Sequence, residues 1–178
     1  MQIAVFCSSS NKLAPIYYQE AEELGTFIGK ENHTLVYGGA NRGLMESMAK
    51  AAHAEGAFII GILPSMINDQ ASEFVDELFL VETLSDRKEM IKEYGDVFVA
   101  LPGGFGTLDE MFDVVASAQI GAHDKKLVIV NSNHFYNPLL TMIEQILTEK
   151  FGSESNKSSY VVVNNAAECA KYLKDNIV

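Results

Sequence analysis

The feature that most constrains this chain is the regular alternation of short apolar runs with longer segments of helical periodicity. The runs are continuous in Val, Ile and Leu, which is typical of strands that are covered on both faces. The strands that we expect are Gln2–Cys7, Thr34–Tyr37, Phe58–Leu63, Leu78–Val81, Val97–Leu101, Leu127–Val130 and Tyr160–Val163. The helices that we expect are Pro15–Lys30, Leu44–Ala54, Ser85–Tyr94, Thr107–Ile120, Pro138–Phe151 and Ala166–Asn176. Such a repeat predicts an α/β fold with an open parallel sheet flanked by helices on both faces.

Size and charge exclude several classes of protein. The 178 residues fit a single domain over 1–178, long enough to bury a core without disulfides or metals. Lys and Arg number 13 against 24 Asp and Glu, a net charge of −11. Such a surface disfavours a nucleic-acid or anionic-membrane binder, since phosphate neutralisation needs clustered cations. We therefore expect no nucleic-acid and no membrane partner, although one small phosphate still fits a locally positive pocket.

The two cysteines, Cys7 and Cys169, indicate a reducing environment. The chain begins with a strand pattern rather than a basic, cleavable leader, and no apolar run approaches the ~18 residues of a membrane helix. We expect a cytoplasmic protein whose thiols are small buried hydrophobes. For Cys7 we favour a buried strand end over a nucleophile. The sequence has no cluster of Cys and His residues that would indicate a metal site.

The loop after the first expected strand carries three serines. In an open parallel sheet, ligands bind beyond the carboxyl ends of the strands. Ser8 and Ser9 lie at such an end, where their hydroxyls can donate to a phosphate. An ordinary capped turn is the alternative, and this loop alone would favour it.

The loop after the second expected strand has the pattern G-G-x-x-x-G, which includes Gly39 and Gly43. Glycines let the backbone turn sharply and approach a ligand, and the next helix presents free N–H groups to an anion. Arg42 either reaches a phosphate or is a solvated loop arginine.

The loop after the fifth expected strand is the most informative. Gly103, Gly104 and Gly106 fall within four residues, which is costly for a plain connector because glycine loses the most backbone entropy on folding. Thr107 is placed to cap the following helix and to donate its hydroxyl to an anion. Glu110 stands at capping-box spacing from Thr107, so it also has a purely structural interpretation. No Gly-Lys-Ser/Thr follows, which excludes a Walker loop.

Arg87 and Lys88 stand near the start of an expected helix, whose N-terminal dipole prefers anions. A bound phosphate or carboxylate would relieve this conflict. The alternative is two solvated surface cations.

Together these motifs resemble the LOG family, the cytokinin riboside 5′-monophosphate phosphoribohydrolases, many of which have been labelled lysine decarboxylase-like. The family pattern is P-G-G-x-G-T-x-x-E with an upstream Arg-Lys pair. The positions of this chain that match it are Pro102, Gly103, Gly104, Gly106, Thr107 and Glu110, with Arg87 and Lys88 upstream.

The resemblance implies a Rossmann-like domain that hydrolyses a nucleoside 5′-monophosphate, AMP or an N6-substituted AMP, to free base and ribose 5-phosphate. It implies no cofactor and a homodimer with sites near the interface. The catalytic pair would be Arg87 and Glu110. Substrate contacts would fall on Ser8, Ser9, Gly39, Gly43, Lys88, Gly103, Gly104, Gly106 and Thr107.

Because this chain departs from the family pattern at several positions, the resemblance does not define which base the pocket binds. Ala40 and Glu46 stand where many members have glycine, and Ser117 stands where many have tryptophan. Asp69 and Glu73 are both candidates for an acidic residue that contacts substrate in the family.

Two other functions remain as alternatives. A non-catalytic nucleotide-binding or carrier protein would keep the glycine loops without needing Arg87 and Glu110 together. A pyridoxal-phosphate decarboxylase would need a Schiff-base lysine in a buried site, and the sequence offers no obvious one. Within the hydrolase hypothesis, Arg87 either positions Glu110 or stabilises the departing base.

Overall fold

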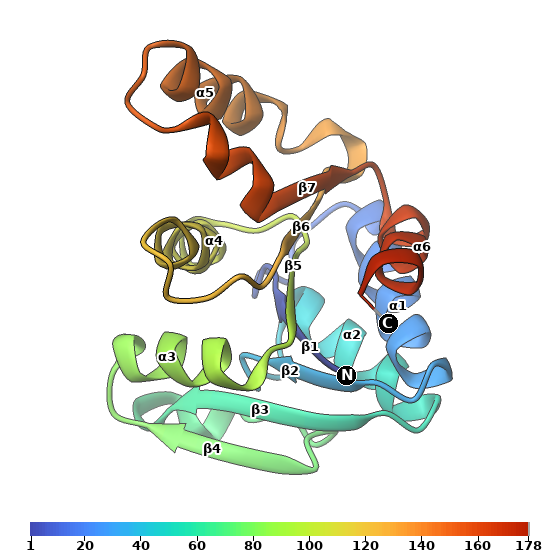
Figure 1. Cartoon of the computed structure of the whole chain (residues 1–178). Coiled ribbons are helices and arrows are strands. Elements are labelled where there is room, and N and C mark those ends of the chain that lie inside the picture. Colours follow the sequence, from blue (N-terminus) through green and yellow to red (C-terminus); the bar gives the residue numbers. More distant parts are fainter. Residues whose placement is uncertain (178) are drawn as a thin grey trace.

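A single parallel sheet organises the chain. The computed structural model describes residues 1–177, and Figure 1 shows helices on both faces of the sheet. Seven strands lie in the order β4-β3-β2-β1-β5-β6-β7, and every neighbouring pair is parallel. The strands are β1 (Gln2–Phe6), β2 (Thr34–Tyr37), β3 (Phe58–Pro64), β4 (Glu77–Val81), β5 (Val97–Ala100), β6 (Leu127–Val130) and β7 (Tyr160–Val163). This confirms the α/β, Rossmann-like fold predicted from the sequence.

The helices cover the two faces in two groups, α1, α2 and α6 on one face and α3, α4 and α5 on the other (Figure 1). Their bounds are α1 (Pro15–Lys30), α2 (Gly43–Ala54), α3 (Leu84–Tyr94), α4 (Phe105–Gln119), α5 (Asn137–Thr148) and α6 (Ala166–Asn176). Short 3-10 helices are η1 (Ser65–Gln70), η2 (Ser132–His134) and η3 (Glu154–Ser159). Within residues 1–177, no helix is long and apolar enough to cross a membrane.

The continuous apolar runs are explained by two-sided burial. All four residues of β5 are fully buried, and alternate side chains of β1 and β5 enter opposite cores. On the α3–α4–α5 face, the rings of Phe6 and Phe98 stack with centroids 6.0 Å apart. Because both faces of the central strands are covered, the sequence lacks the polar alternation of a half-exposed sheet.

The strand order fixes where a ligand is expected. Along the chain, the sheet grows from β1 through β2 and β3 to β4, then returns to add β5 on the other side of β1. The order therefore reverses between β1 and β5, and crevices at such switch points bind ligands in open α/β sheets. The loops after β1 and β5 both open at this point.

Four helices, α2, α3, α4 and α5, start one or two residues before the expected positions, and for two of them the capping residue differs as well. α4 begins at Phe105 with Gly104 as its N-cap, so Thr107 lies inside the first turn and does not cap the helix. The expectation of Ser85 as the cap of α3 is also wrong. Thr83 fills that position, and its hydroxyl accepts a hydrogen bond of 3.0 Å from the backbone of Asp86. A single domain over 1–178 stays a prediction, and Val178 lies outside the described residues.

Candidate active site

A cavity of about 530 Å³ lies at the switch point, beyond the carboxyl ends of β1, β2 and β5. Its walls come from the serine loop, the two glycine loops and the helices that carry the predicted catalytic pair. The lining residues are Val5, Phe6, Cys7, Ser8, Ser9, Ser10, Gly38, Arg42, Met45, Arg87, Gly104, Phe105, Gly106, Thr107 and Glu110. Sequence segments that are far apart thus form one concave site.

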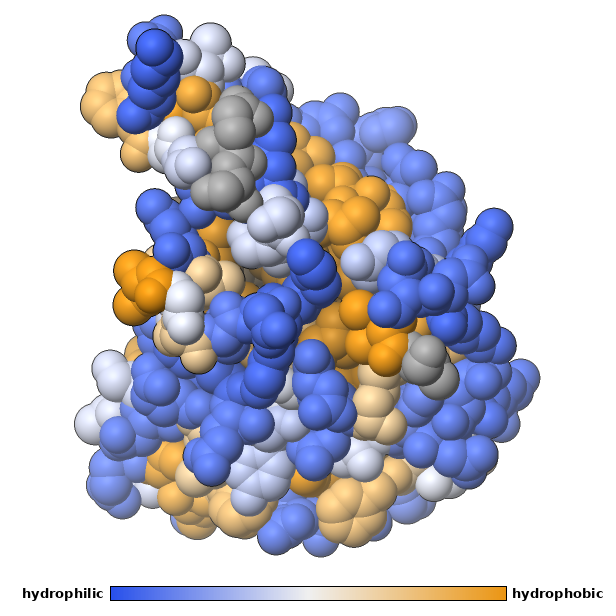
Figure 2. Space-filling view, in the orientation of Figure 1, coloured by the Kyte–Doolittle hydropathy of each residue, from blue (hydrophilic) through white to orange (hydrophobic). Residues whose placement is uncertain are grey.

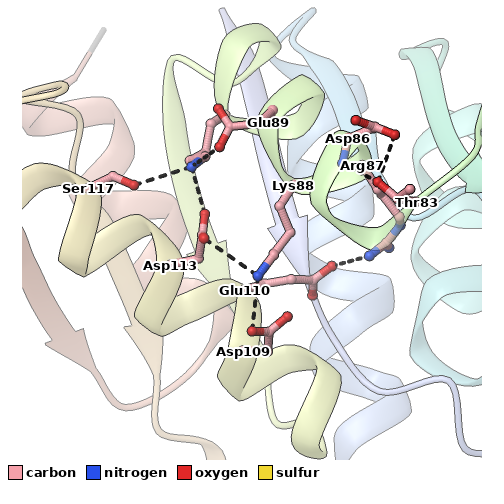
Figure 3. Close-up of polar contacts among 10 residues, drawn as sticks. Thr83, Asp86, Arg87, Lys88, Glu89, Asp109, Glu110, Asp113 and Ser117 are labelled. Carbon is pink, nitrogen blue, oxygen red and sulfur yellow. Dashed lines mark hydrogen bonds and ion pairs between the residues drawn. The ribbon is translucent and has the colours of Figure 1, made fainter.

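An ion pair between α3 and α4 forms one wall of this cavity. Arg87 Nη1 donates to Glu110 Oε1, and the two side chains are only 16% and 8% exposed (Figure 3). Arg87 Nε also donates to the carbonyl of Ile62, over 2.9 Å, so the guanidinium is fixed from two sides. A Cβ on Gly38 would lie 2.3 Å from Arg87 Nη2, which explains why this position lacks a side chain.

The surroundings shift the protonation of two groups in the site. Burial raises the pKa of Glu110 above its ordinary value, while the Arg87 charge and hydrogen bond oppose that shift. Burial, then the nearby Glu110 carboxylate, raises the pKa of the Cys7 thiol far above its ordinary range, with Arg87 opposing. Because the thiolate is the nucleophilic form, Cys7 is unsuited to be a nucleophile.

The glycine loop after β2 is shaped by packing within the chain. Gly39 and Gly43 have positive φ angles of 71° and 56°, a backbone conformation that favours glycine. A Cβ on Gly43 would lie 2.6 Å from the carbonyl oxygen of Ser8. The N–H of Gly43 donates to Asn11 Oδ1 over 2.7 Å, and that of Leu44 donates to Ser8 over 2.9 Å. The first N–H groups of α2 are therefore engaged by the serine loop.

The glycine loop after β5 is different. Gly104 and Gly106 have no positive φ, and a Cβ on either would meet no atom within 4 Å. Both line the cavity at the start of α4, where the first N–H groups of a helix have no intrahelical partner. Packing does not require glycine here. A ligand that approaches the backbone closely would require it.

The remaining residues of this loop, Gly103 and Thr107, pack against each other at the start of α4. A Cβ on Gly103 would lie 2.0 Å from Thr107 Oγ1, so Gly103 makes room for that side chain. Thr107 lines the cavity while 4% exposed.

The predicted site residues therefore divide into two groups. Those that line the cavity are Ser8, Ser9, Arg87, Gly104, Gly106, Thr107 and Glu110. Those that the structure places outside its lining are Gly39, Gly43, Lys88 and Gly103. The first three of these have other contacts: Gly39 packs on Gly61, Gly43 on the serine loop, and Lys88 on two carboxylates.

Sequence reasoning missed several lining residues, among them Met45 and Phe105. Their only sequence signal is that they adjoin the glycine motifs, because an apolar residue beside a motif usually belongs to the core. A second, smaller cavity of about 190 Å³ shares Ser9, Gly38, Arg42, Met45 and Arg87 with the first. The residues that it adds are mostly apolar: Ala40, Leu63, Pro64, Ile67 and Leu84, with Gln70. The site thus has a polar chamber and a more apolar one, which we call the apolar chamber, and Arg87 borders both.

Neither Asp69 nor Glu73 lines these two cavities, and both are exposed. In the part of the chain that the structure describes, no group of three or more His, Cys, Asp or Glu residues is placed to hold a metal.

Comparisons with known proteins show the family to which this chain is similar. A family model described as "Possible lysine decarboxylase" matches residues 45–173. A cytokinin riboside 5′-monophosphate phosphoribohydrolase of Arabidopsis thaliana is 37% identical over 176 residues, covering 98% of this chain and 82% of the relative. An enzyme of the same name from Rhodococcoides fascians is 37% identical over 163 residues, with coverage of 90% and 82%.

Solved structures with the same fold include a molybdenum cofactor binding protein of Rippkaea orientalis, at a TM-score of 0.79 and 22% identity, covering 99% of this chain and 97% of that one. The molybdenum cofactor carrier protein of Chlamydomonas reinhardtii reaches a TM-score of 0.76 at 22% identity, with coverage of 98% and 96%. Identity at this level supports the fold alone.

The Arg87–Glu110 pair gives a stability prediction. Arg87→Gln leaves a buried carboxylate without its cation, which costs about 3–5 kcal/mol of unfolding free energy. Without Arg87 the folded-state pKa of Glu110 rises further above its unfolded value, so the loss is relieved as pH falls through that raised pKa. Urea unfolding across pH measures both effects.

Lys30→Gln is the matched control, since Lys30 and Glu55 form an exposed pair at 4.0 Å and removing it costs under about 1 kcal/mol. Equal, pH-independent losses in the two variants would contradict this account of the pair.

Proposed function

We propose that this chain, which belongs to the LOG family of cytokinin riboside 5′-monophosphate phosphoribohydrolases, hydrolyses the N-glycosidic bond of a nucleoside 5′-monophosphate. The products are the free base and ribose 5-phosphate, and AMP or an N6-substituted AMP is the substrate. The observation that carries this proposal is the pair Gly104 and Gly106, whose missing side chains leave open space beside the unpaired N–H groups of α4.

The phosphate belongs at the start of α4. Backbone N–H groups and the positive end of the helix dipole favour an anion there, and Thr107 adds a hydroxyl. Ser8 and Ser9 line the same cavity and offer two more hydroxyls. With the phosphate in this place, the ribose reaches Arg87 and Glu110, and the base extends toward the apolar chamber beyond Arg87.

Glu110 supplies the chemistry at the sugar. Cleavage of an N-glycosidic bond passes through an oxocarbenium-like ribose, whose positive charge a nearby carboxylate stabilises. The C1′–N bond breaks and its electron pair leaves with the base. A water molecule forms the new C1′–O bond and passes one proton to Glu110. The leaving base takes up one proton from solvent, and Glu110 releases the proton of the water to solvent, so the protons balance.

Arg87 positions this carboxylate. Its bonds to Glu110 and to the carbonyl of Ile62 hold the pair in one geometry. Its charge also favours the ionised form of Glu110, which burial alone would disfavour. The proposed reaction requires no cofactor to carry a group or electrons, because one water molecule supplies the hydroxyl that C1′ gains and, in the net balance, the proton that the base gains.

The phosphate site predicts a strong preference for nucleotide over nucleoside. Charged hydrogen bonds contribute about 1.5–3 kcal/mol each, so losing two of them lowers kcat/KM roughly 100-fold or more. Release of adenine from AMP and from adenosine, measured side by side, tests this.

Gly104→Val fills the open space with a side chain and should lower the hydrolysis rate of AMP to that of adenosine. Adenosine turnover is the internal control for folding and should not change. Equal wild-type turnover of AMP and adenosine would refute the phosphate site.

Glu110 gives the second kinetic prediction. Glu110→Gln keeps the size of the side chain but removes its charge, so kcat should fall by about 10²–10⁴-fold. In the wild type, activity is lost as pH falls through the raised pKa of Glu110, so the acid limb should lie above about 4.3, the ordinary value for Glu.

Glu46→Gln on α2 is the control, since Glu46 does not line the cavity. Wild-type rates in Glu110→Gln would reduce Glu110 to a structural residue and would favour the alternative of a non-catalytic nucleotide carrier.

A pyridoxal-phosphate decarboxylase, the class that the family model's description suggests, is disfavoured. That chemistry needs a lysine for a Schiff base inside the site. Among the described residues, no lysine lines either chamber, and the nearest in sequence to Arg87, Lys88, is held by two carboxylates.

We place the enzyme in the cytoplasm as a homodimer. The location is supported by Cys7 and Cys169, which are both free and buried. The dimer is supported by exposed apolar side chains along α4 and at its C-cap, where Phe105 is 92% exposed, Phe112 43% and Ile120 83%. Figure 2 shows apolar surface beside the end of α4, as one of several apolar areas on this face. Such patches are typical of protein contacts.

Charging this patch tests the dimer. Phe112→Glu with Ile120→Glu should convert a wild-type dimer into a monomer in sedimentation velocity. Phe58→Glu, at a 49% exposed position on β3, is the control and should leave the dimer intact. A monomeric wild type, or a double variant that still dimerises, would contradict the assignment.

A further inference from the structure

The helix that carries Arg87 has few apolar anchors. Ile91 is the only buried residue of α3. Met90 and Tyr94 are partly buried against the core on the α3–α4–α5 face of the sheet. Leu84, at the start of the helix, is 63% exposed. Apolar packing by itself therefore leaves the position of α3 against α4 weakly determined.

Ion pairs join α3 to α4 beside the catalytic pair. Lys88 Nζ lies 3.0 Å from Asp109 Oδ1 and 3.5 Å from Asp113 Oδ1 (Figure 3). One turn further along, Lys92 Nζ lies 2.7 Å from Asp113 Oδ2 and donates to Ser117 Oγ over 3.2 Å. Asp113 thus bridges both lysines. We refer to Lys88, Lys92, Asp109 and Asp113 as the α3–α4 ladder.

The contacts of the ladder and the catalytic pair join the same two helices, α3 and α4, at similar sequence separations. Arg87 and Glu110 are 23 residues apart, Lys88 and Asp109 are 21 apart, and Lys92 and Ser117 are 25 apart. A nearly constant separation means that the two helices run side by side in the same direction. A shift of α3 along α4 would therefore break the ladder and the Arg87–Glu110 pair together.

Lys88 is poorly placed to serve the phosphate. Its ammonium is held by two carboxylates, does not line the cavity, and its side chain is 19% exposed. The hydrogen bond that Lys88 donates to Asp109 is the main reason that the pKa of Lys88 is raised. To reach an anion at the start of α4, Lys88 would have to leave both carboxylates, which would then repel the anion.

We propose that Lys88 is a positioning residue, which acts with Asp113 and Lys92 to lock α3 against α4 and so to hold Arg87 in register with Glu110. The proposal rests on the hydrolase function proposed above and adds a role that contacts no substrate. Partly exposed ion pairs contribute little to global stability. A displacement of 1 Å at a catalytic group can nevertheless cost about 100-fold in rate.

The test compares Lys88→Met, Asp113→Asn and the double variant, with AMP and adenosine as substrates. We expect each single variant to lower kcat for AMP about 10-fold or more, with KM and the AMP-to-adenosine ratio nearly unchanged. The double variant should be no slower than the slower single variant, because both substitutions break the same lock. The acid limb that reports Glu110 should shift in each variant.

Conservative and distant variants keep the test informative. Lys88→Arg should restore most of kcat by rebuilding the bridge to Asp113, and Lys30→Met should match the wild type because its pair with Glu55 lies on the opposite face. If Lys88→Met does not fold, Asp113→Asn carries the same prediction.

A raised KM for AMP and a collapsed AMP-to-adenosine ratio in Lys88→Met, together with wild-type kcat in Asp113→Asn, would overturn the proposal in favour of a direct phosphate contact. Absence of AMP hydrolysis by the wild type would instead refute the proposed function, so the two failures are distinguishable.

Discussion

The ion pair between Arg87 and Glu110 is the interaction on which the site depends. It joins the two helices that flank β5, and it lies beyond the strand ends where the order of the sheet reverses. The low exposure of both side chains makes the pair sensitive to geometry, because a buried charge is costly without its partner. Gly38, the carbonyl of Ile62 and the α3–α4 ladder all constrain where the guanidinium lies.

The glycines of the site have two distinct physical roles. Gly38, Gly39 and Gly43 make room for other parts of the chain or adopt a left-handed backbone. Gly104 and Gly106 do neither, and they face open space at the start of α4. The motifs look alike in the sequence, yet one glycine loop builds the site and the other leaves room for a ligand.

Much of this architecture is readable from the sequence. The seven apolar runs predict the seven strands because two-sided burial leaves a continuous pattern, and the P-G-G-x-G-T-x-x-E motif identifies the loop that forms the cavity. The start of α3 is harder to predict, because Thr83 and Ser85 are both good caps and only the fold decides between them. The surroundings of Lys88 cannot be predicted from the sequence, since Asp109 and Asp113 face it only after α3 and α4 pack together.

A crystal structure of the E110Q variant with bound AMP tests the central claim most directly. The account predicts phosphate oxygens within about 3.2 Å of the backbone nitrogens that begin α4, C1′ facing the side chain at position 110, and the base in the apolar chamber beyond Arg87. A phosphate bound away from the start of α4, or a ribose turned away from position 110, would contradict it.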